Sequence, residues 1–183
     1  MWRFIQEAIR PSFTAETVFL HIAPEACISR RLRELLGDGY ATADRYAPDV
    51  DLQMDIMNIK FPADHFHYIC CSHVLEHVDD DHKALNEFFR VLKPGGSALL
   101  AVPIDGVTTY EDPSIVLPEE RARAFGQSDH VRAYGDDFID RVAAVGFDVA
   151  RFTADEHLSA ENRLRFGITE HAGDIFLATK PLL

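Results

Sequence analysis

Phe66-His-Tyr-Ile-Cys-Cys-Ser-His-Val-Leu-Glu-His-Val78 is the stretch of this 183-residue sequence that decides the fold. Its apolar first half predicts a buried strand over residues 67–72, and an amphipathic helix follows the Asp79-Asp-Asp81 cluster, whose acids suit a helix start. Leu92-Lys-Pro-Gly-Gly96 ends that helix, and the apolar run after it predicts a second buried strand over residues 98–103. A strand, a helix and a strand in this order predict a right-handed βαβ unit.

Periodic apolar segments on both sides extend this unit into an α/β domain. Further strands are expected at residues 17–22, 40–44, 50–56, 147–152 and 175–179, and further helices at 24–36, 118–125 and 136–145. Alternating strands and helices favour a parallel sheet. Only Arg45-Tyr-Ala-Pro-Asp49 joins the second and third strands, which is too short for the usual crossover helix. We therefore expect that helix to be absent and one sheet edge to be uncovered, which makes a homodimer possible.

The two buried strands and the Lys-Pro-Gly-Gly turn resemble the second half of class I S-adenosylmethionine-dependent methyltransferases, and the resemblance covers about residues 17–180. It implies a Rossmann-like, seven-stranded, mostly parallel sheet with an antiparallel last strand. We expect residues 1–183 to form one domain. Residues 1–16 would be an N-terminal segment or lid, and residues 104–134, which lack a core pattern, an insertion on the side of the methyl acceptor.

The resemblance also implies cofactor contacts at strand ends. Asp44 stands where the family places its ribose-binding acid, and Asp55 where an acid meets the adenine amine, with the N–H of Ile56 facing the ring. Ser72 and His73 would border the methyl-transfer site. The alternative is that both acids are solvated turn residues.

The first loop departs from the family, which has an acid followed by a glycine-rich turn at this point. His21 stands in place of the acid, while Ala23, Glu25 and Cys27 replace the glycines, and Pro24 has no N–H to donate. His21, Ala23, Pro24 and Glu25 are still expected to face the cofactor, with Glu25 pairing with its ammonium. Alternatively, His21 is a core histidine and cofactor binding has weakened.

Two further histidine patterns bear on chemistry. His73-Val-Leu-Glu-His77 matches the H-x-x-E-H pattern of some zinc proteases, but that motif needs both histidines on one helix, and a strand runs directly into His73. No metal site is therefore expected. Within the insertion, His130 is the candidate catalytic base, because an unperturbed imidazole titrates near neutral pH. Asp129 and Arg132 could instead merely fix His130 in the loop.

The composition and net charge of the chain exclude some classes of function. A formal net charge of -12 argues against a nucleic-acid surface, and no apolar run is long enough for a membrane span. Without a CxxC pair, the three cysteines are expected to be reduced packing residues. The protein is also expected to be cytoplasmic. We expect an enzyme that transfers methyl from S-adenosylmethionine to a small-molecule acceptor. The alternative is a catalytically silent ligand-binding or interaction protein on the same fold.

Overall fold

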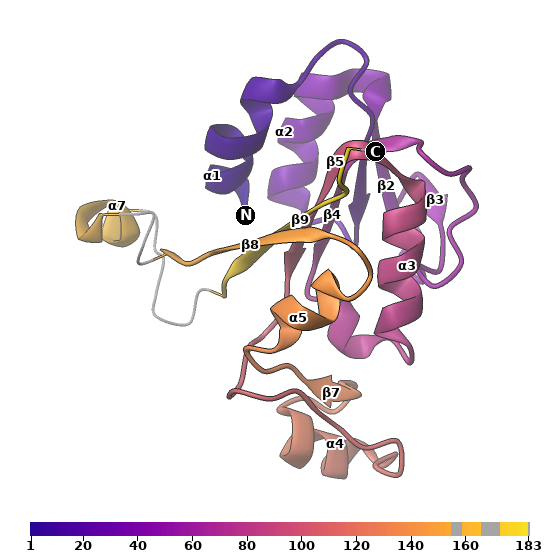
Figure 1. The fold of residues 1–183 in the computed structure, drawn as a ribbon, viewed down its shortest axis with the longest axis vertical. Helices are drawn as coiled ribbons and strands as arrows, with labels where there is room; N and C mark the ends of the chain where they lie inside the picture. The colour runs from indigo at the N-terminus through magenta and orange to yellow at the C-terminus, as the bar shows by residue number, and fades with distance from the viewer. Residues whose placement is uncertain (155–158, 166–172, 183) are drawn as a thin grey trace.

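A computed structural model describes residues 1–154, 159–165 and 173–182, and its main feature is a seven-stranded sheet (Figure 1). The strands follow the order β3-β2-β1-β4-β5-β9-β8. Their bounds are β1 (Phe19–Ile22), β2 (Tyr40–Asp44), β3 (Leu52–Gln53), β4 (Phe66–Ser72), β5 (Leu92–Ala101), β8 (Asp148–Phe152) and β9 (Ile175–Thr179). Only β9 runs antiparallel to its neighbours β5 and β8. The predicted mostly parallel sheet with an antiparallel last strand is confirmed.

Helices cover both faces of the sheet in the described ranges (Figure 1). The helices of the described ranges are α1 (Trp2–Phe4), α2 (Ala26–Leu36), α3 (Asp81–Val91), α4 (Pro118–Phe125), α5 (Phe138–Ala143) and α7 (Ala160–Arg165), with shorter helical turns at Ile5–Ile9, Arg10–Ser12, Gly37–Gly39 and Leu75–His77. Of these, α4 and α7 lie away from the sheet (Figure 1). All of these helices are too short or too polar to cross a membrane.

Neighbouring residues of the central strands point into two separate cores, as the two-residue repeat of a strand requires. Phe19 and Cys70 pack with α2 and the N-terminal turns, whereas Leu20 and Cys71 pack with α3 and α5. Cys70 and Cys71 are thus buried packing residues as predicted. Cys27 is exposed, so its assignment to packing was wrong.

The N-terminal segment belongs to the core on the α2 face. Ile5 is fully buried and Ile9 is only 4% exposed, and both join the cluster around Phe19 and Leu32. This part of the N-terminal segment therefore packs against α2 and the sheet.

The connection between β2 and β3 contains no helix, as predicted, and is held by Asp51. One oxygen of this carboxylate accepts hydrogen bonds from the Thr42 N–H (2.8 Å), the Thr42 hydroxyl (2.7 Å) and Arg33 (2.6 Å). The predicted strand over residues 50–56 was too long, because only Leu52 and Gln53 pair with β2. The chain then turns, since the Asp55 carboxylate accepts from the Met57 N–H (2.9 Å).

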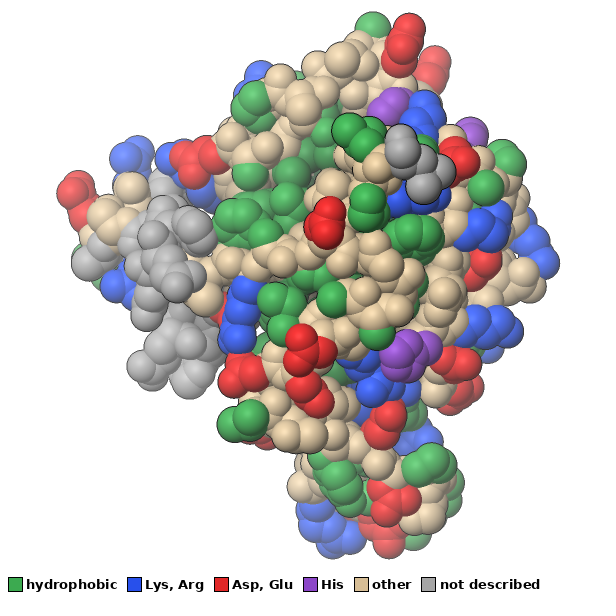
Figure 2. Space-filling view, in the orientation of Figure 1, with side chains coloured by type: hydrophobic (Ala, Val, Ile, Leu, Met, Phe, Trp, Pro, Cys, Tyr) green, Lys and Arg blue, Asp and Glu red, His purple; other side chains and the backbone are tan. Residues whose placement is uncertain are grey.

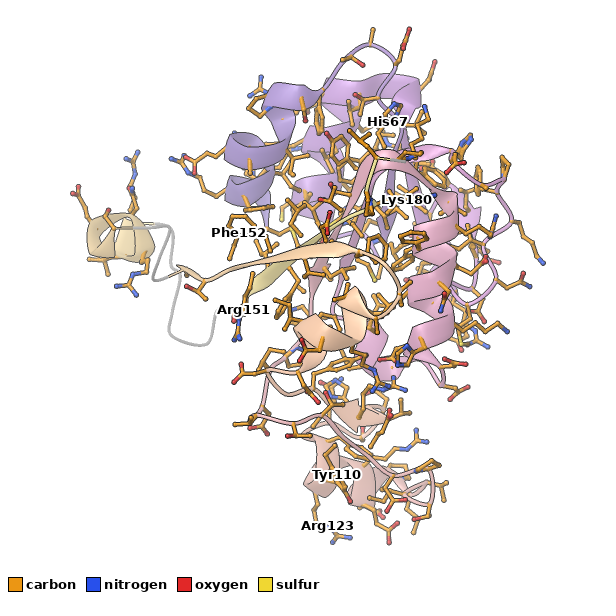
Figure 3. All side chains as sticks on the ribbon, in the orientation of Figure 1. His67, Tyr110, Arg123, Arg151, Phe152 and Lys180 are labelled. Atoms are coloured by element: carbon orange, nitrogen blue, oxygen red, sulfur yellow. The ribbon has the colours of Figure 1, made fainter. Side chains whose placement is uncertain are left out.

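Residues 104–134 form a lobe beyond the edge of the domain body (Figures 1 and 2), which we call the insertion lobe. It contains α4 and a small antiparallel sheet of β6 (Tyr110–Glu111) and β7 (Arg132–Ala133). Tyr110 and Arg123 mark its far end (Figure 3). The small sheet was not predicted. From the sequence, residues 158–171 could supply another pocket wall; of these, only residues 159–165 are described.

Candidate functional site

The site is built where the strand order reverses direction. From β1 the sheet continues to β2 on one side, and from β4 it continues to β5 on the other. Open α/β sheets bind ligands at such a point, beyond the carboxyl ends of the strands. The residues that leave β1 and β4 there, Ala23 (φ +46°) and His73 (φ +55°), both have left-handed backbone. Such conformations are costly for residues with a Cβ and cluster at functional sites.

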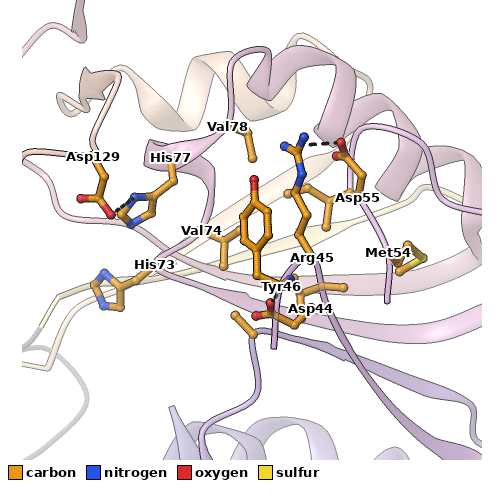
Figure 4. Close-up of a pocket in the computed structure, with 13 residues that line it drawn as sticks. Asp44, Arg45, Tyr46, Met54, Asp55, His73, Val74, His77, Val78 and Asp129 are labelled. Atoms are coloured by element: carbon orange, nitrogen blue, oxygen red, sulfur yellow. Dashed lines mark hydrogen bonds and ion pairs between the residues drawn. The ribbon is translucent and has the colours of Figure 1, made fainter. Parts of the chain in front are cut away.

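A cavity of about 320 Å³ opens at this point (Figure 4). Its volume lies at the lower end of the range for small-molecule sites. It is lined by Ile22, Ala23, Asp44, Arg45, Tyr46, Met54, Asp55, Ile56, His73, Val74, His77, Val78 and Asp129. We call it the switch-point cavity. Five of the residues expected to bind the cofactor are among these: Ala23, Asp44, Asp55, Ile56 and His73.

Asp44 ends β2 and is fixed by the turn that follows. Its Oδ1 accepts hydrogen bonds from the backbone N–H groups of Tyr46 (2.7 Å) and Ala47 (2.8 Å). These bonds orient the carboxylate through one oxygen, and its second oxygen can still accept hydrogen bonds from a ligand. Asp44 and Ala23 also border a neighbouring cavity of about 630 Å³ between α2 and the loop after β2, to which Pro24 contributes.

Asp55 lies on the opposite wall, in the turn after β3. Besides accepting from Met57, it faces Arg45, whose guanidinium lies 3.6 Å from its Oδ2 (Figure 4). The same guanidinium lies 5.3 Å from the centre of the Tyr46 ring. Tyr46 is 77% exposed, which leaves its ring accessible beside the cavity. Sequence reasoning missed both Arg45 and Tyr46.

His21 is fully buried and does not line either cavity. Its Nδ1 lies 2.8 Å from the Tyr40 hydroxyl and its Nε2 lies 2.8 Å from a Glu25 oxygen. Of the alternatives for His21, the structure shows a core histidine, and one that positions Glu25. Burial raises the pKa of Glu25, but the hydrogen bond from His21, a backbone hydrogen bond, the electrostatic interaction with His21 and a smaller contribution from Ser72 together outweigh it, and the pKa is lowered. Glu25, Ser72 and His21 are therefore brought together.

The chain after β4 presents two histidine–carboxylate pairs. His73 Nδ1 lies 3.4 Å from Glu76, and this hydrogen bond raises the pKa of His73. His77 Nδ1 lies 3.3 Å from Asp129 of the insertion lobe. His73 precedes the short turn Leu75–His77, so the two histidines do not share a helix. The zinc-protease geometry is absent from this segment.

His130, the expected catalytic base, lies behind the cavity wall. It is 8% exposed, its Nδ1 lies 3.1 Å from the Phe125 carbonyl, and its ring packs edge-on against His77 at 4.6 Å. Within the described residues, the hydrogen bonds and ion pairs of Asp129 and Arg132 go to other groups. Asp129 contacts His77, and Arg132 donates to the carbonyls of Leu75 and Val78 at 2.8 and 2.6 Å.

Comparison with known proteins agrees with this geometry. A family model described as a methyltransferase domain matches residues 16–100. Over 49 residues the chain is 45% identical to the ubiquinone/menaquinone biosynthesis C-methyltransferases UbiE of Vibrio campbellii and Vibrio parahaemolyticus. That match covers 27% of this chain and only about a fifth, 19%, of the length of those relatives.

Solved structures share the fold over nearly the whole chain. An S-adenosylmethionine-dependent methyltransferase from Mesorhizobium loti superposes with a TM-score of 0.61 at 13% identity, covering 96% of this chain and 97% of that one. The YcgJ protein of Bacillus subtilis has a TM-score of 0.61 at 19% identity, with 94% of both chains covered. The resemblance to class I methyltransferases that the sequence indicated is confirmed for the fold and for the domain match.

Proposed function

We propose that this chain, whose residues 16–100 match the methyltransferase domain and whose sheet has the class I order, transfers methyl from S-adenosylmethionine to a small-molecule acceptor. One observation carries the proposal most directly. Asp44 ends β2, whereas Asp55 and Ile56 lie in the turn after β3, and all three line the same cavity at the point where such sheets bind ligands. Both acids therefore face a cavity and not only the surrounding solvent, which supports a binding role for them.

The cofactor would lie with its adenosine between Asp44 and Asp55. A free Asp44 oxygen can accept from the ribose diol, and Asp55 can accept from the adenine amine beside the backbone of Ile56. The Tyr46 ring can stack on the base. These contacts supply binding and orientation, which are the main needs of a cofactor that carries its own reactive methyl group.

The methionine end would meet the remodelled first loop. Ala23 has the left-handed backbone for which glycine is the default residue, so this turn has a glycine-type conformation although the glycine is missing. Glu25, held by His21, presents a partly exposed carboxylate (38% of its side chain) that can pair with the cofactor ammonium. The left-handed turn at Ala23 supports an enzyme over the catalytically silent binding protein that is the alternative.

Methyl transfer itself depends mainly on alignment of the acceptor atom, the methyl carbon and the sulfonium. The acceptor would enter at the end of the cavity lined by His73, His77 and Asp129, opposite Asp55 (Figure 4). His77 lies between His130 and this space, so the proposed role of His130 in catalysis would act through His77.

The test uses S-adenosylmethionine labelled in its methyl group, incubated with the purified protein and a metabolite extract. The proposal predicts label in the small-molecule fraction together with formation of S-adenosylhomocysteine. Saturable cofactor binding without transfer to any fraction would favour the silent binding protein. Absence of S-adenosylmethionine binding would reject the cavity as a cofactor site, both for an enzyme and for a silent binding protein.

A further inference from the structure

We propose that Glu76, His77 and His130 form a binding site for a divalent transition metal of the Zn²⁺ type at the acceptor end of the switch-point cavity. One candidate ligand atom from each residue lies within 4.8 Å of the other two. Two imidazoles and one carboxylate, with an open position for water or substrate, are a known donor set of catalytic zinc. Imidazole nitrogen also favours Zn²⁺ over the harder Mg²⁺ and Ca²⁺.

The buried carboxylate of Glu76 is the independent observation that points to a ligand. Glu76 is 1% exposed, and its Oε2 has no hydrogen-bond partner within the described ranges 1–154, 159–165 and 173–182. Its other oxygen lies 3.4 Å from His73. Buried charged groups normally pair with another group or coordinate a metal, because an unpaired charge in the interior is costly. A cation between Glu76 and the two histidines would satisfy this oxygen.

Both histidines already have the partners that metal ligands usually have. Metal-bound imidazoles almost always use their second nitrogen on a carboxylate or a carbonyl, which fixes the ring. His77 Nδ1 faces Asp129 at 3.3 Å, and His130 Nδ1 faces the Phe125 carbonyl at 3.1 Å. In each ring the Nε2 atom is therefore the one left for a metal.

The backbone around the three residues is fixed in advance. The Val131 N–H donates to the Glu76 carbonyl (2.9 Å), and the nearly buried Arg132 donates to the carbonyls of Leu75 and Val78. These bonds hold the insertion lobe against the turn that carries Glu76 and His77. With metal–ligand bonds of about 2.0–2.2 Å in tetrahedral geometry, the donor atoms lie about 3.4 Å apart. The three ligand atoms lie within 4.8 Å of one another here, and small side-chain rotations would bring them to that separation.

A metal here would lie where the acceptor enters, since His77 and Asp129 line that end of the cavity. Its use in catalysis rests on the proposed methyl transfer: it would bind an acceptor oxygen and lower the pKa of that group. Metal binding itself is independent of the cofactor. A test without S-adenosylmethionine therefore separates failure of this site from failure of the proposed function.

The experiment titrates chelator-treated protein with Co²⁺ and Zn²⁺, following Co²⁺ by its visible absorption and Zn²⁺ by calorimetry. The wild type should bind one ion per chain, and Glu76→Gln, His77→Gln and His130→Gln should each weaken binding by about tenfold or more. The control is His82→Gln, an exposed histidine on α3, which should bind within about threefold of the wild type.

A thermal melt covers the case in which a histidine variant folds poorly. Ions that bind only the folded state raise the melting temperature. Zn²⁺ should therefore raise the melting temperature of the wild type. It should not raise the melting temperature of Glu76→Gln, a variant that preserves the shape of the side chain. Absence of saturable one-to-one binding in the wild type would overturn the proposal. So would unchanged affinity in all three ligand variants, or a loss with His82→Gln as large as theirs.

Discussion

Removing the charge of Asp81 should destabilise the protein strongly and loosen the insertion lobe. Asp81 begins α3, is 1% exposed, and accepts hydrogen bonds from Arg141 (2.7 and 2.8 Å) and from the Tyr134 hydroxyl (2.7 Å). Asp81→Asn keeps the shape but leaves the Arg141 guanidinium facing an amide. Breaking a buried ion pair in this way costs about 3 to 5 kcal/mol of unfolding free energy.

Urea denaturation at pH 7 measures this loss, with Asp140→Asn as the matched control because Asp140 is exposed on α5. The control should change the unfolding free energy by less than about 0.5 kcal/mol. A loss below about 1 kcal/mol for Asp81→Asn would refute the reasoning, because the network would then be no stronger than a surface ion pair.

The same network gives a pH dependence. Burial alone would raise the pKa of Asp81, but the hydrogen bonds from Arg141 and Tyr134 and the charge of Arg132 outweigh it and lower the pKa. The stabilisation is therefore complete above the ordinary aspartate pKa of about 3.9 and is lost as the pH falls through the lower folded value. The stability difference between wild type and Asp81→Asn should shrink below about pH 4.

Three further predictions concern the switch-point cavity. Ala23→Gly should raise the unfolding free energy by about 0.5 to 1 kcal/mol in urea denaturation, because relief of left-handed strain exceeds the entropy cost of glycine; a destabilised variant would contradict this. Glu25→Gln should weaken binding of S-adenosylmethionine more than binding of an analogue without the amino group, and equal losses in calorimetry would reject the ammonium contact. Tyr46→Ala should weaken cofactor binding by about 1 kcal/mol while Tyr46→Phe does not, if the exposed ring stacks on adenine; equal effects would point to the hydroxyl instead.

The regular elements could be predicted because local pattern and burial agree there. The bounds of β2, β9 and α4 match the predicted ranges residue for residue. Alternating or β-branched residues mark the two strands, and a proline at the start and a glycine after the end mark the helix. The strand predicted over residues 50–56 fails for a physical reason. Met54 and Ile56 are buried, but their side chains enter the core from a turn, and alternation alone cannot separate the two cases.

Parts of the site could not be predicted because they depend on tertiary contacts. The left-handed backbone at Ala23 has no glycine to signal it. Asp129 contacts His77 and not its neighbour His130, and this partner is set by the docking of the insertion lobe. Glu76 and His130 are distant in sequence and meet because Val131 and Arg132 donate hydrogen bonds to the turn that carries Glu76. In contrast, Asp44 and Asp55 could be placed on the cavity from the sequence because strand ends of a parallel sheet meet at one edge.

Calorimetric titration of S-adenosylmethionine into the wild type, Asp44→Ala, Asp55→Ala and Asp38→Ala tests the central claim most directly. Asp38 is an exposed acid just before β2, at the opposite end of the strand from Asp44, and serves as the control. We predict saturable wild-type binding, a loss of about 1 to 3 kcal/mol in each of the first two variants, and no change in the control. Folded Asp44→Ala and Asp55→Ala proteins that bind as tightly as the wild type would contradict the assignment of this cavity to the cofactor.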